Sequence, residues 1–246
     1  MRDYDPSTYG EHIAEAYDSW ASTGQDTEGA VEFLSVLAAG GRVLELGIGT
    51  GRVALPLAAR GIKVQGIDAS PAMVGKLQAK PGGDKIPVTL GDFAQVPVEG
   101  QFTLIYVVFN TFFALLTQES QLKCFLAVAQ HLSNAGVFVL ENFVPDLTRF
   151  DRGQRTDTIA VSVETLRIDA TIHDAVNQRC HVQHVLIDEG GIRMYPVQLR
   201  YAWPSELDLM ARLAGLELHH RYGGWKNELF SNASVRHVSV YRRASP

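Results

Sequence analysis

The sequence has very little cysteine and no long apolar run. Cys124 and Cys180 are its only 2 cysteines among 246 residues. Their wide separation excludes a CxxC motif and a disulfide framework, so the cytoplasm, a reducing compartment, is the expected location. The opening segment MRDYDPSTYGEHIAEAYDSW is acidic and aromatic, without the apolar core of a signal peptide. No signal peptide and no membrane-spanning segment are expected.

Basic charge is not in excess either. The 22 Lys and Arg residues face 27 Asp and Glu residues, which gives a formal net charge of -5. Proteins that bind nucleic acid usually present a basic face, so a nucleic-acid partner is not expected. A small anionic ligand held by one or two arginines remains compatible with this balance. Hydrophobic residues at 46% and charged residues at 20% are typical of a globular chain and exclude a mainly disordered one.

Residues 41–145 alternate between apolar strands and helices. The predicted strands are RVLEL, IKVQGID, IPVTLGD, FTLIYVVFN and GVFVLENF. The predicted helices between them are RVALPLAAR, SPAMVGKLQAK and TQESQLKCFLAVAQHL. Strands that are apolar throughout and separated by helices imply a parallel sheet covered on both faces. This pattern predicts a doubly wound, Rossmann-like α/β core.

Three further segments flank this core. Residues 1–40 carry apolar residues at helical spacing and predict an N-terminal helical segment. Residues 146–203 alternate apolar and polar residues around the turn signals AVN and EGG, which predicts an antiparallel insertion of about three strands. Residues 204–246 return to a helix, PSELDLMARLAG, and to two strands that would complete a mostly parallel, seven-stranded sheet.

The stretch VLELGIGTGRV has three glycines at alternate positions between the first strand and the first helix of the core. Open α/β sheets bind ligands at the carboxyl ends of their strands, and glycine there leaves the backbone bare. We expect Gly47 to permit a tight turn and Gly49 and Gly51 to permit close approach of a ligand. A simple turn needs one glycine, so three favour a nucleoside site over a plain connection.

The spacing of these glycines discriminates between nucleoside cofactors. A Walker loop needs a lysine after its last glycine, and a dinucleotide loop needs a third glycine at position 52, which is Arg52. Glu45 brings a carboxylate near the loop, which is unfavourable beside a pyrophosphate and favourable beside a cation. Asp68 ends the second strand, where a carboxylate fits ribose hydroxyls. Asp92 and Phe93 fit the amino group and the ring of adenine.

These segments together resemble the class I S-adenosylmethionine-dependent methyltransferases. The matching segments are VLELGIGTGRVALPLA, VQGIDASPAMV, TLGDFAQVP, FTLIYVVFNTFFAL and HLSNAGVFVLENF, in family order over residues 40–143. The resemblance implies S-adenosyl-L-methionine as the cofactor and methyl transfer as the activity. The cofactor-binding residues that it implies are Tyr9, Tyr17, Glu45, Gly47, Gly49, Gly51, Asp68, Ala69, Met73, Asp92, Phe93 and Phe109.

The resemblance also implies where some of these residues lie around the cofactor. It puts Glu45 and Gly47 beside the methionine end and Asp68 on the ribose. The implied neighbours of the adenine are Met73, Asp92 and Phe93. The N-terminal segment is similar to the helix that small-molecule members fold over the cofactor as a lid, which makes Tyr9 and Tyr17 pocket residues. The alternative is that these tyrosines are simply half-buried against the core.

Phe109 and Asn110 are implied to border the methyl group. Their segment, Phe109-Asn110-Thr111-Phe112, lacks the Asp/Asn-Pro-Pro-Tyr/Phe signature of family members that methylate amino groups of nucleobases and glutamine amides. We therefore expect a different, small-molecule acceptor. An amine of a polar metabolite or sugar ranks first, because the architecture is similar to N-methyltransferases of nucleotide-linked amino sugars and a neutral amine needs no strong base.

A hydroxyl or carboxylate oxygen ranks second as the acceptor, and a catalytically silent cofactor-binding subunit is the alternative from another class. No catalytic base can be named from spacing. His181 and His184 are three positions apart on a predicted strand, so they face opposite sides and predict no metal site.

The residues predicted to bind the acceptor are Asn110, Arg200, Tyr201, Tyr222 and Trp225. Arg200, with Arg221 and Lys226, would hold an anionic group of the substrate. The alternative for Arg200 is a solvated arginine at the end of a strand. Trp225 lies in a predicted loop, RYGGWKNELF, where a tryptophan is costly unless it packs on something. It could pack on the substrate or plug the insertion against the core. The insertion is also a candidate homodimer interface.

Overall fold

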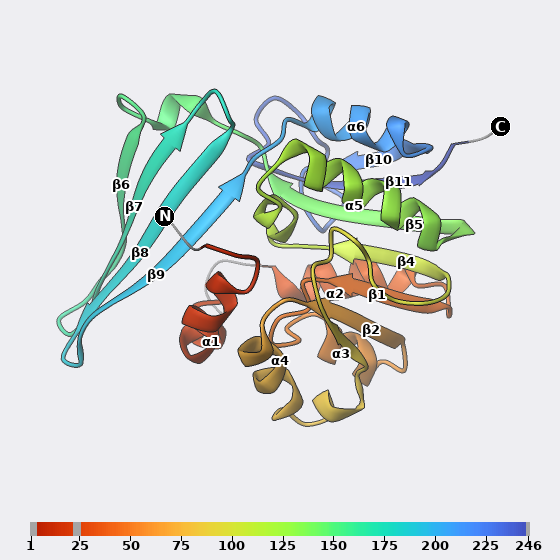
Figure 1. Ribbon diagram of the computed structural model, residues 1–246, viewed down its shortest axis with the longest axis horizontal. Coiled ribbons are helices and arrows are strands. Elements are labelled where there is room, and N and C mark those ends of the chain that lie inside the picture. Colours follow the sequence, from red (N-terminus) through yellow and green to blue (C-terminus); the bar gives the residue numbers. More distant parts are fainter. Residues whose placement is uncertain (1–3, 22–25, 245–246) are drawn as a thin grey trace.

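The computed structural model describes residues 4–21 and 26–244 of the chain. Figure 1 shows a layered α/β body with a second sheet projecting from it. The helices are α1 (Thr8–Ala21), α2 (Thr27–Leu37), α3 (Ala54–Ala59), α4 (Pro71–Gln78), α5 (Gln118–His131) and α6 (Pro204–Leu213). The short 3-10 helices are η1 (Gly83–Lys85), η2 (Thr111–Ala114) and η3 (Leu147–Arg149). No helix in these ranges is both long and apolar enough to cross a membrane.

Sheet A has seven strands and is mostly parallel, as predicted. Its order is β10 (Leu216–Tyr222), β11 (Arg236–Arg243), β5 (Leu132–Phe143), β4 (Phe102–Val107), β1 (Arg42–Leu46), β2 (Lys63–Asp68) and β3 (Val88–Leu90). Strands β1 to β5 pair in parallel, and β10 and β11 pair antiparallel to complete the edge. The strand order reverses between β1 and β4, and ligands of such sheets bind outside the carboxyl ends at this point.

Both faces of sheet A are covered at its centre, which explains why central strands such as β4 are largely apolar. On β1, Val43 packs into the cluster on the α2 and α3 face, whereas Leu44 and Leu46 pack into the cluster on the α5 and α6 face. Alternate residues of a strand point to opposite faces, so a strand buried on both sides has no polar face.

Sheet B is the predicted antiparallel insertion, but it has four strands where about three were expected. They are β6 (Gln154–Val161), β7 (Leu166–Asp174), β8 (Arg179–Asp188) and β9 (Gly191–Arg200), paired in chain order. The segment expected to be one strand reverses at Ser162–Thr165, where the Ser162 Oγ accepts hydrogen bonds from the backbone N–H groups of Glu164 and Thr165. A serine-based turn of this kind carries no glycine or proline signal.

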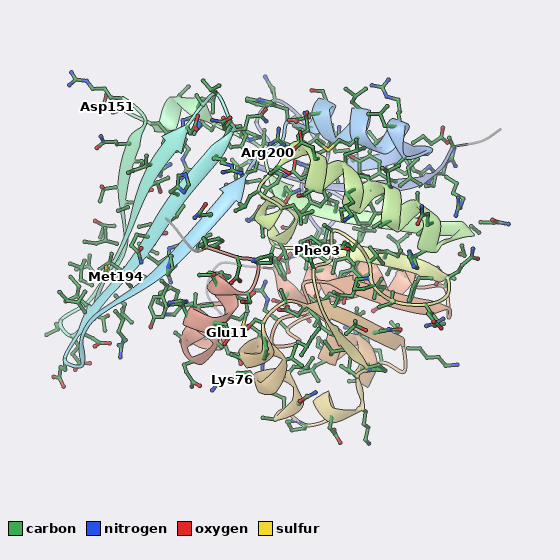
Figure 2. All side chains as sticks on the ribbon, in the orientation of Figure 1. Glu11, Lys76, Phe93, Asp151, Met194 and Arg200 are labelled. Atoms are coloured by element: carbon green, nitrogen blue, oxygen red, sulfur yellow. The ribbon has the colours of Figure 1, made fainter. Side chains whose placement is uncertain are left out.

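Helix α1 lies between sheet B and helix α4 (Figure 1). Its inward residue Ile13 is buried with Met73 of α4 and Tyr195 of β9. Helix α2 packs instead on sheet A, where Leu34 is fully buried. Figure 2 shows Met194 towards the free end of sheet B and Arg200 where β9 meets α5. The fold therefore brings α1, sheet B and the carboxyl edge of sheet A together.

Candidate active site

The glycine loop after β1 has three residues in the left-handed region, with φ of 72° at Gly47, 55° at Gly49 and 77° at Gly51. A Cβ at Gly47 would lie 2.4 Å from Cγ2 of Thr111, and one at Gly51 would lie 2.3 Å from Cδ1 of Leu77. These two glycines are therefore required by close packing of the loop on η2 and α4. A Cβ at Gly49 would have Met73 at an ordinary contact distance, 3.5 Å, and would project into open space.

That open space is a cavity of about 250 Å³ between the carboxyl edge of sheet A, α1 and η2, which we call the glycine-loop cavity. It lies beside the point where the strand order reverses, as the fold predicts. The predicted cofactor residues that line it are Tyr9, Tyr17, Gly47, Gly49, Asp68, Ala69, Met73, Asp92 and Phe93. Residues from four separate chain segments thus converge on one cavity.

Asp68 is held rigidly at the wall of this cavity. Its Oδ2 accepts a hydrogen bond from the Gly49 N–H at 2.7 Å and its Oδ1 accepts one from the Ser70 N–H at 2.9 Å. Burial raises the pKa of Asp68, and the backbone hydrogen bonds oppose that rise. Each carboxylate oxygen keeps a further lone pair, so both can accept from a diol. Asp92 is fixed similarly, since its Oδ1 accepts from the Ala94 N–H at 2.8 Å.

Glu45 and Gly51 are not among the residues that line this cavity. Glu45 is 3% exposed, and its Oε2 accepts a hydrogen bond from the Tyr106 hydroxyl at 2.8 Å. Burial raises the pKa of Glu45 to about 8. The side chain points to the same face of sheet A as Tyr106, outside the cavity.

A second cavity of about 360 Å³, the sheet-B cavity, adjoins the first one. The residues that line both are Tyr4, Tyr9, Tyr17, Thr111 and Ala114. Sheet B contributes Arg167, His184 and Val197 to the second cavity, and α1 contributes Trp20. Helix α1 therefore covers two connected spaces, one beside the glycine loop and one beside sheet B.

Phe109 and Asn110 line the sheet-B cavity. Both have positive φ, 56° and 67°, which is uncommon for residues with side chains and concentrates at functional sites. The end of β5 holds them in place, because the Phe109 N–H donates to the Glu141 carboxylate at 2.7 Å and the Phe143 N–H donates to the Asn110 Oδ1 at 2.6 Å. The guanidinium of Arg52 stacks on the Phe109 ring with its Cζ 3.5 Å from the centroid.

Arg200 and Tyr201, predicted to contact the acceptor, line neither cavity. Arg200 is 6% exposed and donates to the Gln121 Oε1 at 2.6 Å and to the Glu206 Oε1 at 2.7 Å, so it ties β9 to α5 and α6. Tyr201 is buried, and its hydroxyl lies 3.0 Å from the His173 Nε2. The end of β9 is therefore packed in the core and does not reach either cavity.

Tyr222 and Trp225 also line neither cavity. Their rings pack edge-to-face on Phe33 of α2, at centroid distances of 5.6 and 5.5 Å. Arg221 forms an ion pair with Asp208 rather than reaching a cavity. Trp225 covers the core, in line with the packing alternative, but its partner is α2 and not the insertion.

Sequence reasoning missed the polar residues that sheet B brings to its cavity. The His184 Nδ1 lies 2.6 Å from the Asp169 Oδ1, and these residues are direct cross-strand partners on β8 and β7. Arg167 lies two positions before Asp169 and stacks on Trp20, with its Cζ 4.3 Å from the ring. If the AVN turn is placed between Asp174 and Arg179, counting back along both strands pairs Asp169 with His184.

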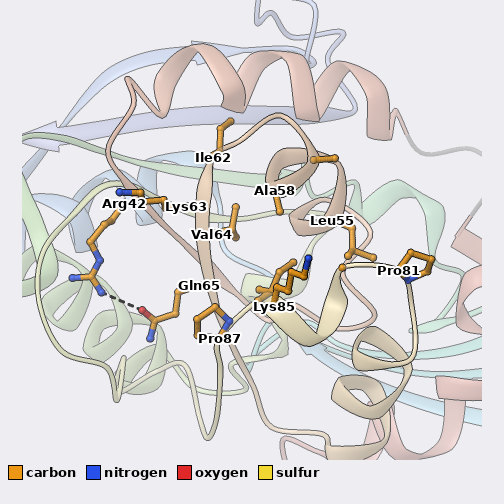
Figure 3. Close-up of a pocket in the computed structure, with 13 residues that line it drawn as sticks. Arg42, Leu55, Ala58, Ile62, Lys63, Val64, Gln65, Pro81, Lys85 and Pro87 are labelled. Carbon is orange, nitrogen blue, oxygen red and sulfur yellow. Dashed lines mark hydrogen bonds between the residues drawn. The ribbon is translucent and has the colours of Figure 1, made fainter.

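A third cavity lies at the opposite, amino edge of sheet A (Figure 3). Arg42 and Lys63, the first residues of β1 and β2, line it, and the Arg42 Nη2 donates to the Gln65 Oε1 at 3.2 Å. The length of the strands separates it from Gly47 and Asp68, which follow or end the same strands. It is therefore not part of the site.

The fold and the site together define an enzyme of the Rossmann-like, nucleoside-binding class. The glycine loop and the two aspartates lie at the carboxyl edge of the sheet, where such enzymes bind nucleoside cofactors. The adjoining cavity under α1 offers space for a second reactant.

Comparison with known proteins makes the assignment specific. Residues 43–136 match the family described as "Methyltransferase domain". The chain is similar to the CcbJ methyltransferase from Streptomyces caelestis, with 40% identity, a TM-score of 0.93 and coverage of 98% of this chain and 100% of that one. It is 28% identical over 244 residues to the cypemycin N-terminal methyltransferase from Streptomyces sp, covering 97% of this chain and 99% of that protein.

CalS10, an amino pentose methyltransferase from Micromonospora echinaspora, has the same fold, with a TM-score of 0.70 at 21% identity over 93% of this chain and 96% of that one. The chain belongs to the S-adenosylmethionine-dependent methyltransferases, and S-adenosylmethionine is its methyl donor.

Proposed function

We propose that this methyltransferase methylates an amine of a small polar metabolite or sugar. The observation that carries the proposal is the sheet-B cavity, which adjoins the glycine-loop cavity beneath α1. Its volume of about 360 Å³ falls in the range of small-ligand sites, about 300–1,000 Å³. A covered space of this size suits a small molecule and keeps water away from the reacting atoms.

The cofactor would occupy the glycine-loop cavity. Asp68 would accept hydrogen bonds from the ribose hydroxyls through its remaining lone pairs, and Asp92 would accept one from the adenine amino group. Phe93 and Met73 would contact the adenine ring, and the bare backbone at Gly49 leaves room for the nucleoside. S-adenosylmethionine supplies an electrophilic methyl group on a positively charged sulfur.

The acceptor would occupy the sheet-B cavity. Tyr9 and Tyr17 line both cavities, so they would flank the path between the methyl donor and the acceptor. Aromatic faces stabilise positive charge, which this reaction carries throughout. Phe109 and Asn110, fixed by their bonds to β5, would border the transferred methyl group. Alignment of this kind accelerates a substitution without covalent participation of the protein.

An amine acceptor is supported by the names of relatives. The cypemycin enzyme, 28% identical to this chain, is named as an N-terminal methyltransferase. An N-terminus offers an amine nitrogen to the donor. CalS10 is named as an amino pentose methyltransferase, and it shares the fold at lower identity. An amine needs only to be held in its neutral form, because its own lone pair forms the new bond.

Mass spectrometry of products tests this proposal. The purified enzyme and S-adenosylmethionine are incubated with an amino pentose, a short peptide with a free N-terminus, a phenol and a carboxylic acid. We expect a mass gain of one methyl group on an amine. Methylation of the oxygen acceptors alone would overturn the amine proposal. Tight S-adenosylhomocysteine binding without any turnover would instead support a silent cofactor-binding subunit.

We also propose that sheet B mediates homodimer formation. Ile172, Ile192 and Met194 are 63%, 68% and 61% exposed. The strand register puts them on the face of sheet B opposite to His184. An apolar sheet face of this kind is typical of an interface between protein chains.

A further inference from the structure

One wall of the sheet-B cavity holds a paired histidine and aspartate. His184 on β8 and Asp169 on β7 are directly opposite each other, so their side chains share a face, and the Nδ1 to Oδ1 distance is 2.6 Å. The side chains are only 19% and 17% exposed, and His184 lines the cavity. The His184 ring packs edge-to-face with the Trp20 ring of α1 at a centroid distance of 5.9 Å. The ring is therefore fixed from two sides.

This pairing determines which ring nitrogen is free. The Asp169 carboxylate can only accept a hydrogen bond, so the Nδ1 of His184 carries the proton. In the neutral imidazole the Nε2 then has a bare lone pair and accepts a proton. Asp169 also supplies the negative charge that would balance an imidazolium. A paired carboxylate is how a histidine is oriented as a base in enzymes.

The other titratable groups lining this cavity are poor proton acceptors. Burial raises the pKa of Tyr4, Tyr9 and Tyr17, so their hydroxyls keep their protons at neutral pH. The Arg167 guanidinium has only hydrogen-bond donors and no acceptor. Its positive charge on the same wall also disfavours a second cation in the cavity, such as an acceptor that is still protonated. His184 is thus the lining residue that combines a free lone pair with a compensating carboxylate.

We propose that His184, oriented by Asp169, takes the proton that the acceptor nitrogen must lose before methyl transfer. This inference rests on the proposed amine function and names the base for it. A free alkylamine near neutral pH is mostly ammonium and has no lone pair to donate. The N–H bond breaks, its electron pair stays on nitrogen, and the proton goes to the Nε2 of His184. The nitrogen pair then forms the bond to the methyl carbon, and the carbon–sulfur bond breaks with its pair left on sulfur.

In this scheme His184 is the catalytic residue and Asp169 is a positioning residue. The product leaves as a methylated ammonium ion, and His184 returns its proton to solvent. Asp169 and Arg167 of β7 and Tyr195 of β9 share the sheet face of His184, and Tyr9 and Tyr17 of α1 line the same cavity. On the far side of Asp169, Asp157 of β6 is its cross-strand partner and is paired with Arg155.

The test compares pH profiles of variants. With the amine found by the acceptor panel, we expect His184→Ala to lower kcat about 100-fold at pH 7, the effect typical of a lost general base. The deficit shrinks as pH rises, and added imidazole restores part of the rate. Asp169→Asn shows a smaller loss that imidazole does not restore. Affinity for S-adenosylhomocysteine, measured by calorimetry, stays unchanged in both variants. The matched control is His181→Gln, on the same strand but the opposite face, with unchanged kcat.

Nitrogen NMR of histidine-labelled protein supplies a readout that needs no acceptor. We expect the Nδ1 of His184 to carry the proton in the wild type, and Asp169→Asn to shift that proton towards Nε2. If His184→Ala methylates the amine with the wild-type kcat and pH profile, the pair has a purely structural role. That result overturns the inference about the base and leaves the proposed amine function unchanged. Methylation of oxygen acceptors alone overturns both. If no acceptor is methylated, a proton found on Nε2 overturns the inference and one on Nδ1 supports it.

Discussion

Asp68 serves both the loop and the proposed cofactor site. Its two oxygens accept bonds from the Gly49 and Ser70 N–H groups, which aims the remaining lone pairs into the cavity. We expect Asp68→Ala to weaken S-adenosylhomocysteine binding by about 1.5–3 kcal/mol, because charge-assisted bonds to the ribose are lost. Calorimetry measures the change, with the exposed Asp84→Ala as a control. Equal affinities in wild type and Asp68→Ala would show that the ribose lies elsewhere.

Glu45 gives the fold a pH dependence of defined sign. Burial raises its pKa from 4.5 to about 8 in the folded chain. Between these values the folded state binds a proton that the unfolded state does not, so the free energy of unfolding falls as pH rises, by at most about 1.4 kcal/mol per pH unit. Glu45→Gln cannot titrate and can still accept from the Tyr106 hydroxyl.

We therefore expect the stability of cofactor-free wild type to fall relative to Glu45→Gln from pH 5 to pH 8. Urea unfolding at several pH values measures both proteins. If the two stability curves run parallel over this window, then Glu45 does not hold a proton in the folded state.

Gly49 and Gly51 are neighbours in the loop with different physical reasons to be glycine. A Cβ at Gly51 would collide with Leu77, whereas a Cβ at Gly49 would enter the glycine-loop cavity. Each alanine also costs about 1–2 kcal/mol of backbone strain at positive φ. We expect Gly51→Ala to lower the melting temperature more, and Gly49→Ala to weaken cofactor binding more. Thermal unfolding without ligand measures the effect on stability, and calorimetry with S-adenosylhomocysteine measures the effect on binding. Identical effects of both variants would contradict these separate roles of Gly49 and Gly51.

Residues next to strand ends could be predicted from the sequence, and residues placed by distant packing could not. Asp68 ends one strand and Asp92 comes shortly after another, and the carboxyl ends of these strands must meet at one edge of a parallel sheet. Arg200 offered no comparable signal, because its partners Gln121 and Glu206 come from other elements. The Asp169–His184 pair depends on hairpin register, which alternation alone does not fix.

At the scale of elements, polar bonds fasten α1 over the glycine-loop cavity. The Asp18 carboxylate accepts from the Thr50 hydroxyl at 2.6 Å and pairs with the Lys80 Nζ at 2.7 Å. The Glu11 Oε1 accepts from the Ser70 hydroxyl at 2.7 Å, beside Asp68. Thr50 belongs to the glycine loop, so the helix is tied directly to the proposed cofactor site.

We expect the double variant Glu11→Ala and Asp18→Ala to release S-adenosylhomocysteine about tenfold faster, because α1 opens more readily. Stopped-flow fluorescence measures the release. Glu32→Ala is the control, since it removes an exposed carboxylate of α2 and leaves every bond of α1 in place. Equal release rates in all three proteins would mean that α1 does not limit exit of the ligand.

The elements of sheet A could be predicted because apolar periods and glycine breaks mark each of them. Sheet B was harder, since the reversal at Ser162–Thr165 depends on a serine hydroxyl and not on glycine or proline. The two hairpin turns with clearer signals, AVN and EGG, were predicted correctly. The error in strand number therefore has a local chemical cause.

At the scale of the whole molecule, sheet B has two faces with different environments. The face that carries His184 closes the cavity over α1, and the opposite face carries apolar side chains that the chain itself leaves exposed. Burial of such side chains between two copies would stabilise a dimer by about 25 cal/mol per Å² of apolar surface. The same association would brace the free end of sheet B, near Met194 (Figure 2).

We therefore expect the wild type to elute at twice its chain mass of 27.0 kDa in size-exclusion chromatography with light scattering. The double variant Ile172→Glu and Met194→Glu should elute as a monomer, because each dimer interface would bury four uncompensated carboxylates. Leu229→Glu, a change at an 87% exposed position outside sheet B, is the matched control and should stay dimeric. If the wild type remains monomeric across a range of concentrations, sheet B does not mediate a homodimer. If the control variant also becomes monomeric, the interface includes the region of Leu229 and is not confined to sheet B.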